Sequence, residues 1–178
     1  MNFGLRIAGK KHPDEPVALR NRPHGPAGGF GGLQLNMQKH HESVLAKEIL
    51  QHLHPREDGL IVDGTLGNGG HAELILKNTA PGLRVLGIDR DEQAIERAGK
   101  RLAPFRNRVT LIHGNFSDIK NILKKANVMN VDGLLLDLGV SSPQLDSPER
   151  GFSFMRNGPL DMRMDSTQKT TAADLLVK

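Results

Sequence analysis

Apolar runs and amphipathic stretches alternate along the chain from about residue 43 to residue 137. Continuous apolar runs, several ending in a polar residue, predict strands over residues 60–63, 83–89, 109–113 and 134–137. Apolar positions at helical spacing predict helices over residues 43–53, from the turn at 64–70 to about 78, over 91–102, and from Ser117 onward. This alternation is typical of an α/β fold, in which helices cover both faces of a parallel sheet.

The turn after the first predicted strand is rich in glycine. Residues 63–71 read Asp-Gly-Thr-Leu-Gly-Asn-Gly-Gly-His, and glycine lets backbone N–H groups approach a ligand closely. The second predicted strand ends in Asp89, and this pairing is typical of a site for a nucleoside-bearing cofactor. Because the glycines do not form a clean G-x-G-x-x-G, the pattern leaves a dinucleotide and S-adenosylmethionine both open.

Acidic residues end three of the four predicted strands, namely Asp63, Asp89 and Asp137. The remaining strand leads into Gly-Asn-Phe at 114–116. The carboxyl ends of parallel strands meet at one edge of a sheet, so these residues are expected to line one crevice. A single aspartate at a strand end more often caps a turn; several beside a glycine turn favour a ligand site.

Composition changes sharply near residue 38. Residues 1–38 contain four prolines and the run Gly-Gly-Phe-Gly-Gly, which predicts a disordered tail. We predict a Rossmann-like core over 39–140 and a substrate-facing segment over 141–178. Residues 1–41 hold six basic and two acidic residues, whereas residues 42–178 hold 18 of each, so the net charge of +4 belongs to the tail.

Composition also excludes several kinds of site. The chain has no cysteine, which excludes disulfides and thiolate metal sites. No apolar stretch approaches the roughly 20 residues that cross a bilayer, and the start lacks the apolar core of a secretion signal, so we expect a cytoplasmic protein without a membrane partner. We predict no metal site. His40, His41 and His113 lack partners at ligand spacing, and the alternating charges at 161, 163 and 165 favour salt bridges.

Residues 138–165 show no clear periodicity and predict a long loop. The loop carries aromatic and basic residues suited to RNA, because phenylalanine stacks on bases and guanidinium groups bind phosphates; these residues are Phe152, Phe154, Arg150, Arg156 and Arg163. An interpretation in which the phenylalanines pin the loop to the core carries equal weight.

Five motifs together resemble one family. They are His-Glu-Ser-Val-Leu at 41–45, the glycine turn at 63–71, Asp-Arg-Asp at 89–91, Asp-Leu-Gly-Val-Ser-Ser-Pro-Gln-Leu-Asp at 137–146, and the run 149–165. Residues 40–178 resemble the ribosomal RNA small subunit methyltransferase H (RsmH/MraW) family. The resemblance implies a class I methyltransferase that uses S-adenosylmethionine to methylate the exocyclic amino nitrogen of a cytosine in small-subunit rRNA, with that RNA or the 30S subunit as partner.

The resemblance also implies roles for individual residues. The methionine end of the cofactor is expected to lie against Gly69, Gly70 and His71. Asp89 is expected to bind the ribose hydroxyls and Phe116 the adenine, while Asp137 and Gln144 complete the pocket near the reacting end. Asp137 is also the candidate catalytic residue that accepts the amino proton of the cytosine, a role that the sequence does not separate from cofactor binding.

The sheet of a class I methyltransferase normally has seven strands, and only four are predicted here. We therefore expect a sheet that is incomplete at its C-terminus, in a fragment whose last residues begin a helix and which binds cofactor weakly without turnover. Two alternatives remain, a non-catalytic RNA-binding or assembly module with this fold and an NAD-dependent oxidoreductase. The oligomeric state is open, and a homodimer is one arrangement that the sequence allows.

Overall fold

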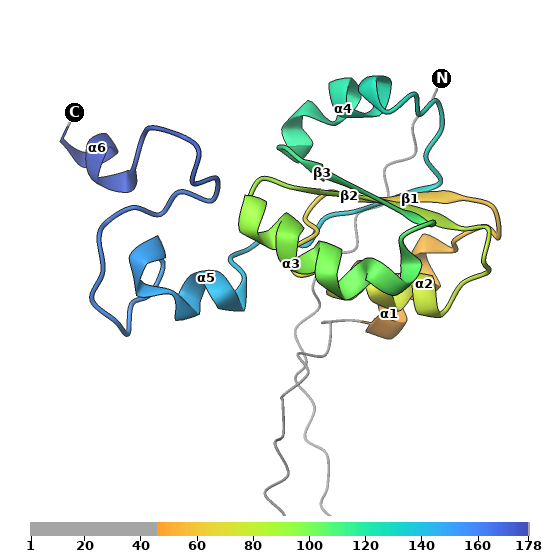
Figure 1. The fold of residues 1–178 in the computed structure, drawn as a ribbon, viewed down its shortest axis with the longest axis horizontal. Helices are drawn as coiled ribbons and strands as arrows, with labels where there is room; N and C mark the ends of the chain where they lie inside the picture. Colours follow the sequence, from red (N-terminus) through yellow and green to blue (C-terminus); the bar gives the residue numbers. More distant parts are fainter. Residues whose placement is uncertain (1–45, 178) are drawn as a thin grey trace, which may run out of the picture. The chain divides into compact units, whose positions relative to one another are not determined.

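The computed structural model describes residues 46–177, in which four parallel strands form one sheet (Figure 1). The strands are β1 (Leu60–Asp63), β2 (Arg84–Asp89), β3 (Val109–His113) and β4 (Gly133–Leu135). Their spatial order is β3-β2-β1-β4, so the chain winds outward from β1 through β2 to β3 and then returns to the other side of β1. The reversal places the topological switch point between β1 and β4, where sheets of this kind bind ligands.

Helices cover both faces of the sheet, as Figure 1 shows. One apolar cluster joins Ile61 of β1 and Val85 of β2 to α1 (Ala46–Leu53), α2 (Gly70–Lys77) and α3 (Glu92–Leu102). The other joins Val62 of β1 and Ile88 of β2 to α4 (Ile119–Lys125). Because neighbouring residues of a strand point to opposite faces, each strand supplies both clusters. The predicted α/β fold, a Rossmann-like parallel sheet with flanking helices, is confirmed.

Two of the boundaries that differ from the prediction have a local polar cause. The fourth strand ends at Leu135 rather than at Asp137, because the Asp137 N–H donates to Thr65 Oγ1 at 2.7 Å instead of continuing the ladder. Ser117 does not cap the following helix. A 3-10 turn, η2 (Phe116–Asp118), comes first, and the side chain of Asn115 caps it by accepting from the Ser117 N–H at 3.0 Å.

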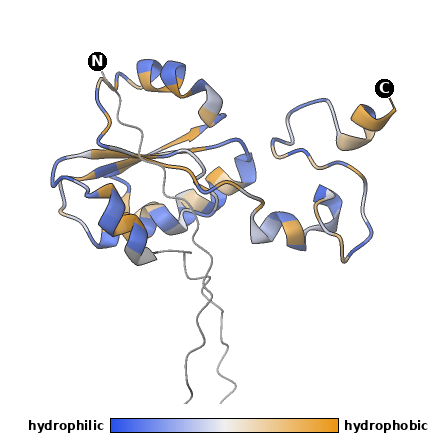
Figure 2. Cartoon of the chain, turned by 180° about the vertical axis from the view of Figure 1, so that it is seen from behind, coloured by the Kyte–Doolittle hydropathy of each residue, from blue (hydrophilic) through white to orange (hydrophobic). Residues whose placement is uncertain are grey.

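The long loop predicted over 138–165 contains regular structure. Residues after β4 form α5 (Ser142–Asp146) and a 3-10 turn, η3 (Pro148–Arg150), and a further 3-10 turn, η1 (Ala103–Phe105), follows α3. The expected C-terminal helix is confirmed as α6 (Ala172–Leu176), which Thr171 caps. The end of α6 is apolar (Figure 2), and the Leu176 side chain is 76% exposed.

Some expectations lie outside the described residues, namely the tail over 1–38, the motif at 41–45 and the start of the first helix at Ser43. Within residues 46–177, no helix has the length and apolar character required to span a membrane.

Candidate functional site

Backbone hydrogen bonds fasten the glycine turn to the end of β2. The Leu66 N–H donates to Ile88 O at 3.0 Å, and the Gly67 N–H donates to Asp89 Oδ2 at 2.7 Å. Gly67 has a φ of 53°, which places it in the left-handed region that favours glycine. The Asp89 carboxylate therefore lies directly against the turn, as the sequence predicts for a cofactor site.

The other side of the same turn is fastened to the chain that leaves β4. The Gly64 N–H donates to Leu135 O at 2.9 Å, and Thr65 Oγ1 accepts from the Asp137 N–H. The Asp137 side chain is exposed. The turn thus spans β1 from β2 to β4 and brings Asp89 and Asp137 to the same edge of the sheet.

Asp63 lies beneath this turn and has no exposed surface. One carboxylate oxygen accepts from the Thr65 N–H at 3.2 Å, while Oδ2 has no hydrogen-bond partner among the described residues. Burial, together with the negative charges of Asp89 and Asp137, raises the pKa of Asp63 to about 7, although the bond from Thr65 opposes the shift. Charge repulsion between these aspartates means that a cationic ligand would be favoured here.

Phe116 lies beside the turn because β3 is the neighbour of β2. The Gly114 N–H that follows β3 donates to Asp89 O at 2.8 Å, and η2 then begins at Phe116. A Cβ added to Gly64 would lie 3.2 Å from the Phe116 Cβ and 2.6 Å from Leu136 Cδ2. Only glycine at residue 64 permits this close approach, so the structure brings Phe116 to the site that the sequence predicts.

Gly69, Gly70 and His71 form the junction between the turn and α2. Gly69 is the N-cap of α2 with a φ of 76°, and an added Cβ would lie 3.1 Å from Leu102 Cδ1 of α3. Gly69 is thus required for the turn and for the packing of α2 on α3. Gly70 and His71 are the first two residues of α2.

Gln144 is more deeply buried than a pocket-lining residue would be, with 5% of its surface exposed. Its Nε2 donates to Asp91 Oδ2 at 3.0 Å, and its Oε1 accepts from the Ser141 N–H at 2.9 Å. Both ends of the amide are therefore bound within the protein, Nε2 at Asp91, which caps α3, and Oε1 at the backbone of Ser141. A direct role of Gln144 in cofactor binding stays a prediction.

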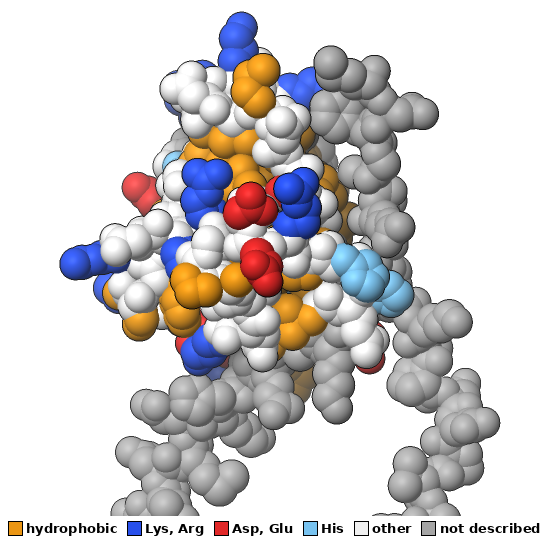
Figure 3. Space-filling model, turned by 90° about the vertical axis from the view of Figure 1, so that its right-hand side faces the viewer, with side chains coloured by type: hydrophobic (Ala, Val, Ile, Leu, Met, Phe, Trp, Pro, Cys, Tyr) orange, Lys and Arg blue, Asp and Glu red, His pale blue; other side chains and the backbone are white. Residues whose placement is uncertain are grey.

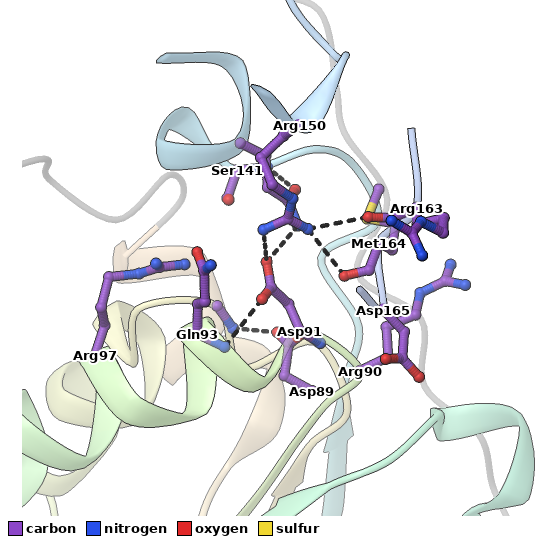
Figure 4. A network of polar contacts seen from close by, with 12 residues as sticks. Asp89, Arg90, Asp91, Gln93, Arg97, Ser141, Arg150, Arg163, Met164 and Asp165 are labelled. Carbon is purple, nitrogen blue, oxygen red and sulfur yellow. Dashed lines mark hydrogen bonds and ion pairs between the residues drawn. The ribbon is translucent and has the colours of Figure 1, made fainter. Parts of the chain in front are cut away.

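Arg150 is one of the residues that the sequence marks as suited to RNA, but its guanidinium is bound within the protein. The residue is 9% exposed, and its guanidinium donates to Asp91 Oδ2 at 2.9 Å, to Arg163 O at 3.0 Å and to Met164 O at 3.1 Å (Figure 4). Burial alone would raise the pKa of Asp91, but hydrogen bonds from Arg150 and Gln144 outweigh it and hold this pKa below its usual range. Sequence reasoning missed the pairing of Asp91 with Arg150, since 59 residues separate them.

Arg163, like Arg150, is bound to groups of the same segment. Arg163 donates to both carboxylate oxygens of Asp161, at 2.8 and 2.6 Å, which confirms the predicted salt bridge. Hydrogen bonds from Arg163 lower the pKa of Asp161 to about 2.

His113 Nε2 lies 3.0 Å from Arg90 O, whereas His40 and His41 lie outside the described residues. Across residues 46–177, no three His, Asp or Glu side chains gather as metal ligands.

Phe154 does not pin the segment to the core, because its side chain is 90% exposed. Phe152 is half-buried, so the pinning interpretation holds at most for that residue. On the face that Figure 3 shows, acidic and basic side chains lie interspersed. This mixture agrees with the balanced charge of residues 42–178.

Comparison with known proteins places this geometry in context. The model of the MraW methylase family matches residues 38–178. A ribosomal RNA small subunit methyltransferase H from Syntrophotalea carbinolica is 54% identical over 136 residues, which are 76% of this chain and 43% of that protein. A protein of the same name from a Geobacter species is 56% identical over 137 residues, 77% of this chain and 44% of its own.

Among solved structures, an rRNA methylase from Streptococcus thermophilus is 20% identical, with a TM-score of 0.43 over 53% of each chain. The chain spans less than half the length of the curated relatives it matches. The family match nevertheless includes the glycine turn, the three strand-end aspartates and the whole segment around Arg150. On this match, the chain belongs to the MraW methylase family.

Proposed function

We propose that this chain forms the cofactor-binding part of an S-adenosylmethionine-dependent methyltransferase that acts on the exocyclic amino nitrogen of a cytosine in small-subunit rRNA. The observation that carries the proposal is the coincidence of the family match over residues 38–178 with three aspartates around one glycine turn. The relatives' name supports rRNA as substrate. We propose the 30S subunit as the partner and the cytoplasm as the location.

The residues at the strand ends fit a cationic cofactor. Asp63 Oδ2 is buried without a partner among the described residues, and a positive charge nearby would stabilise its carboxylate. Each oxygen of Asp89 accepts one backbone N–H, from Gly67 and from Asp91, so lone pairs remain for two ribose hydroxyls. S-adenosylmethionine, when bound, supplies the electrophilic methyl group. The family match favours this cofactor over the dinucleotide alternative.

Other residues would complete the cofactor pocket. Phe116 lies beside Gly64 and offers an apolar surface for the adenine. Gly69, Gly70 and His71 would hold the methionine end of the cofactor, at the junction between the glycine turn and α2. Each of these assignments is a proposal that substitution tests.

Asp137 is the proposed catalytic residue. Its backbone is fixed by Thr65 while its carboxylate is exposed, so the side chain is available to a base brought to the edge of the sheet. The amino lone pair of cytosine is delocalised into the ring, and a carboxylate that accepts the amino proton localises it as the methyl arrives. Alignment of the amine with the methyl group contributes much of the rate, since good positioning supplies roughly 7–11 kcal/mol.

The first experiment is a calorimetric titration of the chain with S-adenosylmethionine, with NAD as the ligand control. We expect saturable binding that Asp89→Ala abolishes and that NAD does not reproduce. Asp58→Ala is the matched control, because the Asp58 side chain is 82% exposed, and it should bind normally. Failure of the folded chain to bind S-adenosylmethionine would refute the cofactor assignment.

The second experiment incubates the chain with unmethylated 30S subunits and the cofactor and measures cytosine mass in the rRNA. Methylation that Asp137→Asn abolishes would support the catalytic assignment. The sequence predicts cofactor binding without methylation for this chain, whereas methylation would exclude the non-catalytic RNA-binding or assembly module. Sedimentation of the chain alone would decide between a monomer and a homodimer, which the sequence leaves open.

A further inference from the structure

Asp91 stands at the junction between the proposed cofactor site and α3. It lies two residues beyond Asp89, is 1% exposed, and caps α3 by accepting from the Gln93 N–H at 3.0 Å. Its own N–H donates to Asp89 Oδ1 at 2.9 Å. Any movement of the Asp89 carboxylate therefore acts directly on the backbone of Asp91.

The second carboxylate oxygen of Asp91 binds residues far along the chain. Asp91 Oδ2 accepts from Gln144 Nε2 at 3.0 Å and from Arg150 Nη1 at 2.9 Å. Figure 4 shows the guanidinium of Arg150 between Asp91 on one side and the backbone of Arg163 and Met164 on the other. One buried carboxylate thus holds two points of the chain that follows β4.

That chain is itself folded around Arg150. Arg150 O accepts from the Met162 N–H at 3.1 Å. The guanidinium of Arg150 also donates to the carbonyl oxygens of Arg163 and Met164. Gly151 has a φ of 72°, and an added Cβ there would overlap Pro159 O. The start of α6 joins the same unit, because the Ala172 N–H donates to Asp161 O at 2.7 Å. We call residues 141–173 the anchored segment.

We propose that Asp91 anchors this segment to the cofactor-binding edge of the sheet, that Arg150 is a positioning residue of the enzyme, and that their pair transmits cofactor binding at Asp89 to the anchored segment. The transmission rests on the proposed function, whereas the anchor does not. The consequence for function is that the exposed Phe154 and the substrate-facing surface around it are held at a set position relative to the cofactor.

The choice of arginine supports positioning rather than general stability. A buried ion pair often stabilises a fold no more than apolar residues of the same size would, but it fixes geometry because its partners are directional. The planar guanidinium reaches three acceptors at once, on Asp91, Arg163 and Met164. Lysine has the same charge, but its single nitrogen cannot serve acceptors that lie on both sides of the guanidinium.

Hydrogen exchange followed by NMR tests the anchor in the intact chain. The reporters are the N–H groups of Met162 and Ala172, which are bonded within the anchored segment, and those of β1 and β2 serve as the reference. We expect Arg150→Gln to speed exchange at the reporters on the order of tenfold to 100-fold, because buried hydrogen bonds to a charged group are lost. The matched control is Arg156→Gln, which removes an exposed arginine of the same segment and should leave the reporters unchanged.

Arg150→Lys keeps the positive charge and tests positioning separately from folding. It is the deciding variant for the anchor if Arg150→Gln speeds hydrogen exchange in the sheet as well as at the reporters. We expect Arg150→Lys to keep the sheet protected and to speed exchange at the reporters. Equal exchange in Arg150→Lys, Arg156→Gln and the unmodified chain would overturn the anchor.

S-adenosylmethionine is then added to the unmodified chain and to Arg150→Lys. We expect it to slow exchange at the reporters in the unmodified chain and to leave it unchanged in the variant, which a purely structural role of Arg150 does not predict. Slowing by the same factor in both proteins would refute the transmission. Absence of calorimetric binding to the unmodified chain would refute the proposed function and the transmission that rests on it, while the comparison without cofactor still decides the anchor.

Discussion

The buried carboxyl group of Asp63 makes the stability of this protein depend on pH in an unusual direction. The pKa of Asp63 rises from 3.8 to about 7 in the folded chain, chiefly through burial. Between these two values the folded state keeps a proton that the unfolded state has released. The folded chain therefore binds more protons, so the free energy of unfolding falls as pH rises from about 4 to about 7 and then levels off.

The size of this effect follows from the pKa change. A shift of about three units corresponds to about 4 kcal/mol in total, and about 3 kcal/mol of it falls between pH 5 and pH 8. In Asp63→Asn no group titrates at this position. The variant carries a pH-independent cost, because its amide is also buried without a full set of partners. The variant should therefore gain about 3 kcal/mol relative to the unmodified chain between pH 5 and pH 8, whatever that constant cost is.

The chain contains neither tryptophan nor tyrosine, so urea unfolding is best followed by far-ultraviolet circular dichroism. The free energy of unfolding of both proteins is measured at pH 5, 6, 7 and 8, and the difference between them is plotted. Other carboxyl groups, such as Asp161, titrate equally in both proteins and cancel in this difference. A difference that stays constant across this range would show that Asp63 is ionised throughout and would refute the reasoning.

Three further predictions concern packing and proton linkage. Arg108→Met should lower the free energy of unfolding, measured in urea, by about 2 kcal/mol, because it removes hydrogen bonds to the carbonyl oxygens of Leu76, Ala80 and Leu83. Arg106→Met, the control at an exposed position, should change this free energy little. Gly87→Ala should cost about 1–3 kcal/mol in the same assay, because its Cβ would lie 2.7 Å from Leu66 Cδ1 in a buried contact; an unchanged midpoint would contradict it. Binding of S-adenosylmethionine near pH 6.5 should release protons from the protein, because the positive charge of the ligand lowers the pKa of Asp63. Calorimetric binding heats that do not vary with the ionisation enthalpy of the buffer would argue against this release.

The centre of the sheet was predictable from sequence because β1 and β2 are buried on both faces and therefore read as continuous apolar runs. The run over 60–63 matches β1 without error. The fourth strand was placed too long, since its apolar run does not reveal that Thr65 captures the backbone of Asp137. Similarly, serine is a residue type that commonly caps helices, but here the side chain of Asn115, two residues before Ser117, performs that role. Such side-chain hydrogen bonds to the backbone decide where helices and strands end, and they do not show in the spacing of apolar residues.

The candidate site was predictable to a different degree. The positions of Asp63 and Asp89 follow from topology, because parallel strands end at one edge. The role of Arg150 does not follow, since arginine in a loop has the same appearance in sequence whether it faces a phosphate or a buried aspartate. The segment after β4 lacks helical periodicity because α5 is only five residues long and its order comes from contacts with Asp91.

The two fully buried aspartates of the site, Asp63 and Asp91, differ in a way that separates structure from ligand binding. Asp91 is surrounded by donors from Gln93, Gln144 and Arg150, so its charge is balanced within the protein. Asp63 has one donor and a buried oxygen without a partner among the described residues. Since buried polar atoms in folded proteins are nearly always paired, the unpaired oxygen marks where an external positive charge is expected. Asp63 is thus the better indicator of the ligand, and Asp91 of the anchored segment.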